Sequence, residues 1–546
     1  MSEQISPGRL HPEQADPANW ATGRQLRRLT RDATEAHTGG SFMEALSEVY
    51  SVLFSMAIAL AVALGAVQAL NATLATGPEE ATLDPTWLSL VAALIVVGGI
   101  VGLAARLGPV GMGGGRATWW LTAPADRRGL LRPRFVLVPV LGAGVGAAGG
   151  ALALFLADGT PAQILWGVAA FAAGGAVLAL TTTAGQVLRG NRKERRVRPA
   201  ILVGDLLMAA GPLLGVVVAL VRPPAPALLD FTAWPVVAAI LAGAAVVLIV
   251  WAERSLEKIA GRELRARGAV SAYAGGAVTS MDTRELGRAL SVVTAPDSRR
   301  RSISFGWVRG PVTAIMTGDA TVFLRSPRHV IQVFVAASLG LLPVLAGWPI
   351  WLNLLALIVG GYLAAMATGE GSRRAEMAPV LDRHFPISAF DVRKARAIVP
   401  LVVMVLWCVP IFGLWGAAHG HQVGWMIFGL LCAPTFAAGV VRAAYRKPPD
   451  WNKPLVNGPA GPVAPGVMLA FARGPDLVVL ALIPLVIAAI AIGPAPILLL
   501  LQASTSALGF VVATRVRDET KPSWMEQAQA EQERQQQEKA RRKAGR

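Results

Sequence analysis

The sequence predicts an all-α polytopic membrane protein with about 12 transmembrane helices in two pseudo-repeated halves. Two observations predict this fold class. More than half of the 546 residues are apolar, and the mean hydropathy of the chain is positive. Continuous apolar runs recur along the chain, many of them near the roughly 20 residues that cross a bilayer as a helix. Because the runs are continuous rather than alternating, they exclude a membrane β-barrel.

The basic residues separate alternate apolar runs. Of the 51 Lys and Arg residues, only Arg222 falls on the side that the pattern makes external. The positive-inside rule therefore places both termini in the cytoplasm, and we expect a multi-pass protein of the cell (plasma) membrane. The formal net charge of +17 is then an orientation signal that suits anionic lipid headgroups, so the lipid bilayer is the expected partner and nucleic acid is not.

Five segments follow from this pattern. They are a cytoplasmic N-terminal segment (1–48), a first six-span half (49–251), a central cytoplasmic linker with an amphipathic helix (252–328), a second six-span half (329–514) and a charged cytoplasmic tail (515–546). The spans are expected at about residues 50–70, 86–105, 135–157, 163–187, 200–220, 231–251, 330–347, 349–368, 397–418, 423–441, 477–492 and 494–514. An even number of spans separates the halves, which predicts a repeat about an axis along the membrane normal.

A basic stretch occurs directly before the third span of each half. Pro124–Arg134 and Pro386–Arg396 align without a gap, so that Pro124 matches Pro386 and Arg134 matches Arg396. Placing the four arginines of the first copy at mid-bilayer would cost about 10–14 kcal/mol, at about 2.5–3.5 kcal/mol each, which keeps this stretch on the cytoplasmic face. Proline suits the first position of a helix, because its missing N–H has no intrahelical partner there.

Two interpretations of this stretch remain open. One is a short docking helix for a cytoplasmic subunit, in which Leu130 and Leu131 face the membrane or a partner groove while Arg127, Arg128 and Arg132 face water or an acidic surface. The other is a basic loop that only sets the membrane topology.

Two acids begin matching spans. Asp205 and Asp476 are each followed by leucine, and Pro212 and Pro484 come seven and eight residues later, which supports the repeat. A carboxylate near a helix N-terminus is favoured by the helix dipole, so capping is one role and a transport pathway is the other. No acid is expected deeper in a span, which favours an energy source other than an ion gradient.

Motifs of enzymes and cofactor sites are missing from the sequence. No Gly-Lys dipeptide occurs, so a phosphate loop is excluded, and Gly111–Gly115 is expected to be a flexible connection. His419 and His421 have no neighbouring carboxylate or cysteine that would complete a metal site. We therefore expect no catalytic residue, no metal, no cofactor and no enzymatic activity of the chain's own.

The basic stretches resemble a known family. Pro-x-Ser/Asp followed by basic residues and Leu, directly before the third span of a half, is similar to the loop of ABC-2-type exporter permeases, in which a short cytoplasmic helix contacts the ATPase. Met316–Pro327, with its Arg-Ser-Pro end, resembles the interfacial helix before the first span of that family, although the first half has no Arg-Ser-Pro equivalent. The resemblance implies ATP-driven movement of a hydrophobic or amphipathic substrate with a separate cytoplasmic ABC ATPase in two copies. It assigns docking to Pro124, Arg127, Arg128, Leu130, Arg132, Pro386, Val392, Arg393 and Lys394.

Two other classes stay open. A twelve-span secondary carrier of the major facilitator type also has six plus six spans, and Asp126–Gly129 resembles its Asp-Arg-x-Gly loop motif. Against that class, the loop after the second span is long, and the second half has only Asp382-Arg383-His384. A non-transporting membrane scaffold is the third class, which the paired halves disfavour.

Overall fold

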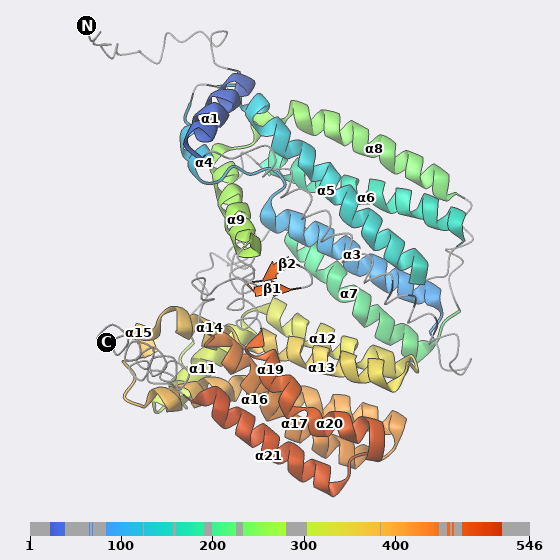
Figure 1. Ribbon diagram of the computed structural model, residues 1–546, viewed down its shortest axis with the longest axis vertical. Helices are drawn as coiled ribbons and strands as arrows, with labels where there is room; N and C mark the ends of the chain where they lie inside the picture. Colours follow the sequence, from blue (N-terminus) through green and yellow to red (C-terminus); the bar gives the residue numbers. More distant parts are fainter. Residues whose placement is uncertain are drawn as a thin grey trace, which may run out of the picture. The chain divides into compact units, whose positions relative to one another are not determined.

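The computed structural model describes residues 22–38, 65, 68, 72, 83–123, 125–156, 160–189, 199–224, 233–279, 303–382, 384–446, 456–458, 461–463 and 472–515. Within these residues the regular secondary structure is helical apart from one small antiparallel pair of strands, β1 and β2 (Figure 1). The α-helices are α1 (Gly23–Thr38), α3 (Pro85–Leu107), α4 (Gly115–Trp119), α5 (Arg127–Leu156), α6 (Pro161–Arg189), α7 (Pro199–Val221), α8 (Trp234–Arg254), α9 (Gly261–Thr279), α11 (Pro311–Leu324), α12 (Pro327–Leu345), α13 (Ile350–Thr368), α14 (Glu370–Met377), α15 (Pro379–Asp382), α16 (Ala389–His419), α17 (Gln422–Ala444), α19 (Pro475–Ala481), α20 (Ile483–Ile487) and α21 (Pro496–Thr514). The other elements are a 3₁₀ turn η2 (Leu256–Lys258), a π-helical segment η3 (Ala488–Ile492), β1 (Val456–Gly458) and β2 (Gly461–Val463).

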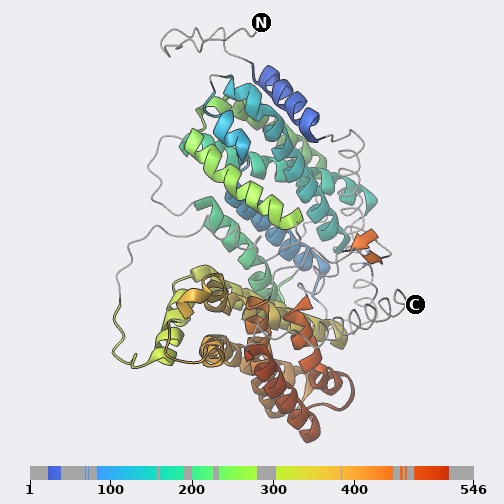
Figure 2. The same cartoon turned by 60° about the vertical axis from the view of Figure 1, so that its left-hand side comes forward.

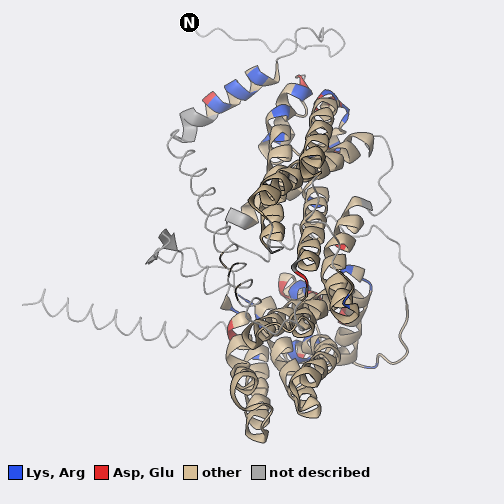
Figure 3. Ribbon diagram, turned by 90° about the vertical axis from the view of Figure 1, so that its right-hand side faces the viewer, with Lys and Arg blue, Asp and Glu red and all other residues tan. Residues whose placement is uncertain are grey.

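The described residues include 10 helices long and apolar enough to cross a membrane, or 11 if one bent pair counts as a span. These helices are α3, α5, α6, α7, α8, α12, α13, α16, α17 and α21, and the bent pair runs from α19 through η3. Their charged residues lie near helix ends, while long central parts carry no charge (Figure 3). An all-α, multi-pass membrane fold is thereby confirmed. All but two residues of the expected first span, and nearly all of the charged tail, lie outside the described residues.

The bend in the eleventh predicted span has a local cause. Pro484 has no backbone N–H to donate within the helix, and its ring collides with the preceding turn, so the two helical pieces meet at 47°. The carbonyl of Ala481 accepts hydrogen bonds from the Gln502 side-chain amide (3.0 Å) and the Thr505 hydroxyl (2.9 Å) of α21. These side chains supply partners for a backbone group at the break, which a lipid environment requires.

The chain divides into two compact units. The first comprises residues 1–303 and 334–357, and the second comprises 304–333 and 358–546. The division cuts the expected central linker at Ile303 and assigns part of the expected second half to the first unit. Both units are helical bundles, and each is described below by itself.

Small residues bring the helices of the first unit together. α3 crosses α7 where Gly102 faces Gly204, and a Cβ on Gly204 would lie 2.5 Å from the Gly102 Cα. Without a hydrophobic driving force in lipid, such close backbone approach supplies the packing contacts. α5, α6 and α8 pack beside one another (Figure 1), and their basic ends join α9 and η2 around a buried apolar core.

In the glycine-rich loop Gly111–Gly115, which the sequence predicted to be a flexible connection, Gly111 and Gly113 pack directly on α9. A Cβ on Gly111 would lie 2.7 Å from the Gly268 backbone nitrogen of α9. The Met112 N–H donates to the Leu264 carbonyl (2.9 Å), and the Met112 side chain is 1% exposed. The glycines therefore allow the loop to lie directly on α9.

The second unit is built on α16, α17 and α21. Large aromatic side chains of α16 and α17 fill its interior, and Trp415, Phe412, Phe428 and Phe436 are fully or almost fully buried. Thr435 of α17 and Ser506 of α21 form a buried hydrogen bond of 2.8 Å that joins these helices. α11 and α14 pack against the basic end of α16 and carry the charged cluster described below.

Candidate functional site

The first basic stretch forms the beginning of a long helix instead of a separate short one. α5 begins at Arg127 and runs without interruption into the predicted third span. The Asp126 carboxylate caps it by accepting from the N–H groups of Arg128 and Gly129, both at 3.0 Å. Pro124, where the sequence predicted the start, lies outside the described residues.

Leu130 does not form a docking surface, contrary to the expectation from sequence. Leu130 is 3% exposed and Leu131 is 1% exposed, and both belong to the core at the basic end of the first unit. The first turns of the helix therefore place these two leucines inward and Arg127 and Arg132 outward. A docking surface here therefore has to be made by the arginines.

The arginines of α5 form an exposed basic face. Arg127 is exposed, and Arg132 keeps 65% of its side chain accessible while its Nε lies 2.9 Å from a Glu253 carboxylate oxygen of α8. Arg128 approaches the same oxygen at 3.5 Å. Two arginines share one carboxylate, so the face remains positively charged.

The N-terminal helix α1 packs on the start of α5 (Figure 2). A Cβ on Gly23 would lie 2.5 Å from the Gly129 carbonyl carbon, and the Arg27 guanidinium donates to the Gly129 carbonyl oxygen. α1 thus adds the exposed Arg24 and Arg28 to the same end of the unit.

The loop before α5 carries a feature that sequence reasoning missed. α4 is a short helix that exposes 75% of Trp119, while Arg116 lies 5.4 Å from the centre of the Trp120 ring. The Trp120 side chain is buried. The signal in the sequence was the pair Trp119-Trp120, which closely follows Arg116 in the loop between two predicted spans.

The second basic stretch also begins a long helix. Ser388 caps α16, because its hydroxyl accepts from the Asp391 N–H at 3.1 Å. Pro386 is exposed just before this cap. Val392 is 3% exposed and packs in a cluster with Ile315 of α11, so its side chain is not available to a partner.

The two basic residues of this copy, Arg393 and Lys394, differ in their contacts. Arg393 donates to the Arg515 carbonyl at 2.7 Å, and its guanidinium stacks 4.4 Å from the Tyr445 ring centre. Lys394 lies 3.0 Å from Asp391 and 4.1 Å from the Phe390 ring centre, with 43% of its side chain exposed. Lys394 and Phe390 therefore join Pro386 among the accessible residues of the second stretch.

Arg396 holds two carboxylates, an arrangement that the sequence did not predict. Its Nη2 lies 2.5 Å from Asp382 Oδ1, and its Nη1 lies 3.0 Å from Asp319 Oδ1. All three side chains are at most 17% exposed. Burial raises the pKa of Asp319 to about 6, an effect that the neighbouring Arg396 only partly offsets.

The two acids proposed for a pathway are both ion-paired. Asp205 binds Arg106 of α3 at 2.5 Å, and Asp476 binds Arg442 of α17 at 2.7 Å. Asp476 also accepts from the Gly474 and Leu477 N–H groups, both at 2.7 Å, as capping predicts, whereas Asp205 lies inside α7. Arg106 and Arg442 directly follow predicted spans 2 and 10, which are not equivalent positions in the repeat. The two matched acids therefore pair with arginines that do not match each other.

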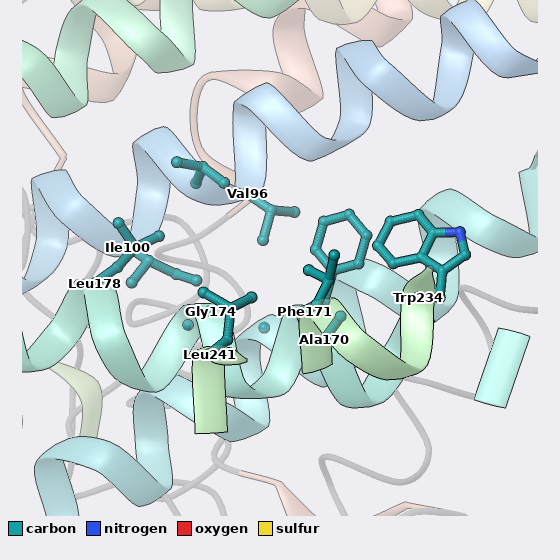
Figure 4. A pocket seen from close by; sticks show the side chains of 12 residues that line it. Val96, Ile100, Ala170, Phe171, Gly174, Leu178, Trp234 and Leu241 are labelled. Carbon is teal, nitrogen blue, oxygen red and sulfur yellow. The ribbon is translucent and has the colours of Figure 1, made fainter. Parts of the chain in front are cut away.

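An apolar cavity of about 160 Å³ lies among the membrane-spanning helices of the first unit. Figure 4 shows it between α3, α6 and α8, with Val96 and Ile100 on one side and the Phe171 and Trp234 rings at one end. The two ring centres are 6.2 Å apart. Each of the 12 residues that line it is glycine or has an apolar or aromatic side chain, so the cavity suits only an apolar group.

Comparison with known proteins identifies the family. The profile of a family of unknown function, DUF6297, matches residues 78–454, which is more than half of the chain. No curated protein and no solved structure matches the sequence. The matched region contains both basic stretches, the Arg106–Asp205 pair and the Arg396 cluster. The chain is therefore a member of DUF6297, a family of unknown function.

Proposed function

We propose that this chain is the membrane-spanning (permease) subunit of an ATP-driven exporter of the ABC-2 type. It moves a hydrophobic or amphipathic substrate and takes its energy from a separate cytoplasmic ABC ATPase bound in two copies. Twelve spans in two halves of six form the pathway in the plasma membrane, with both termini in the cytoplasm. This assignment counts the bent pair and the expected span at residues 50–70 with the 10 long apolar helices.

One repeated arrangement carries the proposal. A short helix in the preceding loop is followed by a long helix with basic residues near its start: α4 precedes α5, and α14 with α15 precedes α16. In the family that these stretches resemble, a short helix in such a loop contacts the ATPase. α11 also precedes α12 after a break at Arg325 and Ser326, as an interfacial helix precedes a first span.

The exposed side chains of these loops suit a protein partner. Trp119 in the first loop is 75% exposed, and Met377 and Val380 in the second are 44% and 60% exposed. Exposed arginines lie near them in the sequence, namely Arg116, Arg127 and Arg374. Tryptophan, methionine and arginine are the residue types enriched at protein interfaces. The basic surroundings favour an acidic groove on the ATPase.

Co-purification tests the proposal. The tagged full chain, extracted from its native membrane in mild detergent, should retain an ATPase subunit. The double reversal Arg127→Glu/Arg128→Glu combined with Lys394→Glu should release that subunit, whereas Arg265→Glu, an exposed arginine of α9, should not. Lys394 is a better choice than Arg393, because reversing Arg393 would also break its contacts with Tyr445 and Arg515. Undiminished ATPase retention by the triple variant would contradict docking at these stretches.

A proton-coupled secondary carrier is the second candidate, and one observation favours it. Asp319 is a buried carboxylate with a raised pKa of about 6, the type of acid that the sequence did not predict. Asp319 lies on the 14-residue α11 and not on a spanning helix, which makes this candidate the weaker one. Proteoliposomes separate the two: a carrier moves substrate under a proton gradient without ATP, an ABC-type permease requires the ATPase with ATP, and a scaffold does neither.

A further inference from the structure

The Arg396 cluster of the second unit contains one more negative than positive charge. Arg396 makes two hydrogen bonds to Asp382, at 2.5 and 3.3 Å, and one to Asp319, at 3.0 Å. The guanidinium carries a single positive charge. Asp382 makes two hydrogen bonds to it, one of them the shortest of the three, whereas Asp319 makes one. A second ionised carboxylate at Asp319 would therefore be left without full compensation.

Asp319 is held where water cannot supply that compensation. Its side chain is 11% exposed, and its carboxylate packs on Gly371 of α14, where a Cβ would lie 2.5 Å from Asp319 Oδ2. Within the described residues, Oδ2 is buried and has no hydrogen-bond partner. Burying an unpaired anionic oxygen costs several kcal/mol or more, so such a group favours its neutral form.

The other groups facing Asp319 do not change this balance. Asp382 on α15 adds negative charge, and Arg374 on α14 is exposed and bound to Glu370 at 2.9 Å. Tyr445, which follows α17, also faces the cluster, and burial raises the pKa of Tyr445 to about 12, so its phenol is neutral at physiological pH. Arg396 is therefore the one buried cation that the described residues bring to Asp319.

We propose that Asp319 is a proton-binding site, in which a proton from solvent on Oδ2 neutralises the second carboxylate and secures α11 against α14 and α16. The proton adds to one carboxylate oxygen, and no other bond is made or broken. A metal cation fits less well, because the guanidinium already occupies the space between the carboxylates. The described residues also contain no group of three acidic, histidine or cysteine side chains that could ligate a metal. The site requires neither the ATPase nor a transport cycle.

The direction of the pH effect follows from linkage. The pKa of Asp319 in the folded protein is about 6, above the value of about 3.9 for an exposed aspartate. The folded state therefore binds more protons than the unfolded state between about pH 4 and pH 6. The stabilisation from the bound proton is complete below about pH 4 and is lost as the pH rises through about 6.

Thermal unfolding of the full chain in lipid nanodiscs tests the site, with Asp319→Asn as a mimic of the protonated form. Asp319→Asn should unfold at a higher temperature than the wild type, and this gain should be smaller near pH 5, where part of the stabilisation from the bound proton remains, than near pH 8, where it is lost. Asp391→Asn is the matched control. The Asp391 side chain at the start of α16 is 47% exposed, and hydrogen bonds from Ser388 and Lys394 lower its pKa, so the variant should show no difference between these pH values. In an Asp382→Asn background, Asp319 becomes the sole partner of Arg396, and the gain from Asp319→Asn near pH 8 should disappear.

Infrared spectroscopy of the wild type gives a measurement that does not depend on a variant. A band of a buried protonated carboxyl should appear as the pH falls through about 6, and Asp319→Asn should lack it. Absence of that band from the wild type at about pH 5 overturns the proposal. An Asp319→Asn effect on unfolding that is equal at both pH values also overturns it, since Asp319 would then keep one charge state throughout.

Discussion

Arg134 and Arg396 occupy equivalent positions in two stretches of one chain, and each binds the loop that precedes its own helix. Arg134 donates to the Gly111 carbonyl at 2.6 Å, and Arg396 binds Asp382 at 2.5 Å. The two arginines therefore fix the angle at which a loop enters a long helix in both units. The acceptors differ, a backbone carbonyl in the first unit and a carboxylate in the second, so only the second cluster acquires buried acids.

Replacing Arg396 should destabilise the second unit strongly. Arg396→Met keeps the length of the side chain but leaves two buried carboxylates without their cation, and breaking a buried ion pair costs about 3–5 kcal/mol. The loss of unfolding free energy should be smaller near pH 5 than near pH 8, because Asp319 is protonated near pH 5 and then needs no cation. Denaturant or thermal unfolding of the nanodisc-embedded protein measures both values. Arg374→Met, at an exposed arginine, should change stability by less than about 1 kcal/mol.

The two arginine–aspartate pairs should differ in their contribution to stability. Arg106 is 7% and Asp205 is 17% exposed, whereas Arg442 and Asp476 are each 31% exposed. Arg106→Gln leaves a buried carboxylate unpaired and should lower the free energy of unfolding by about 3 kcal/mol or more, and Arg442→Gln by about 1 kcal/mol. A double-mutant cycle of Arg106→Gln with Asp205→Asn measures the coupling. Equal losses for the two arginine variants would contradict this ranking.

The α3–α7 crossing should not tolerate a methyl group. Gly204→Ala would place a Cβ 2.5 Å from the Gly102 Cα, and the helices must separate to accept it. Overpacking of this kind costs about 1–3 kcal/mol. Gly243→Ala on α8 is the matched control, since a Cβ there meets no atom within 4 Å. Its alanine should leave the unfolding temperature unchanged or raise it slightly, because alanine favours helix over glycine.

Alanine variants of Trp119 and Trp120 should affect different properties, ATPase retention for Trp119 and the free energy of unfolding for Trp120. Trp119→Ala removes a 75% exposed side chain, so the free energy of unfolding should stay within about 0.5 kcal/mol of wild type while ATPase retention falls. Trp120→Ala removes a buried ring from the core at the basic end of the first unit and should lower the free energy of unfolding by about 3–5 kcal/mol. Unfolding and co-purification are measured on the same preparations. Full ATPase retention by a stable Trp119→Ala variant would count against α4 as a docking helix.

Apolar runs and basic loops are local features, so the sequence by itself determined the class of fold and the position of most spans. The second to tenth and the twelfth predicted spans each correspond to a long apolar helix. Length and hydropathy suffice for this, because a helix satisfies its own backbone and lipid accepts only such segments. The capping of α16 by Ser388 and the break at Pro484 also follow from local chemistry.

The tertiary structure decided which side chains face inward and which charges meet. Leu130 and Val392 are buried because their helices present them to α-helical neighbours, a rotation that the local sequence does not specify. Asp319 and Arg396 are 77 positions apart, and Arg106 and Asp205 are 99 apart. Such pairs form through glycine contacts between helices, at Gly371 and between Gly102 and Gly204. Burial and ion pairing set the charge state of these groups, and both depend on long-range packing. Asp319 therefore becomes a proton-binding carboxylate only in the folded chain.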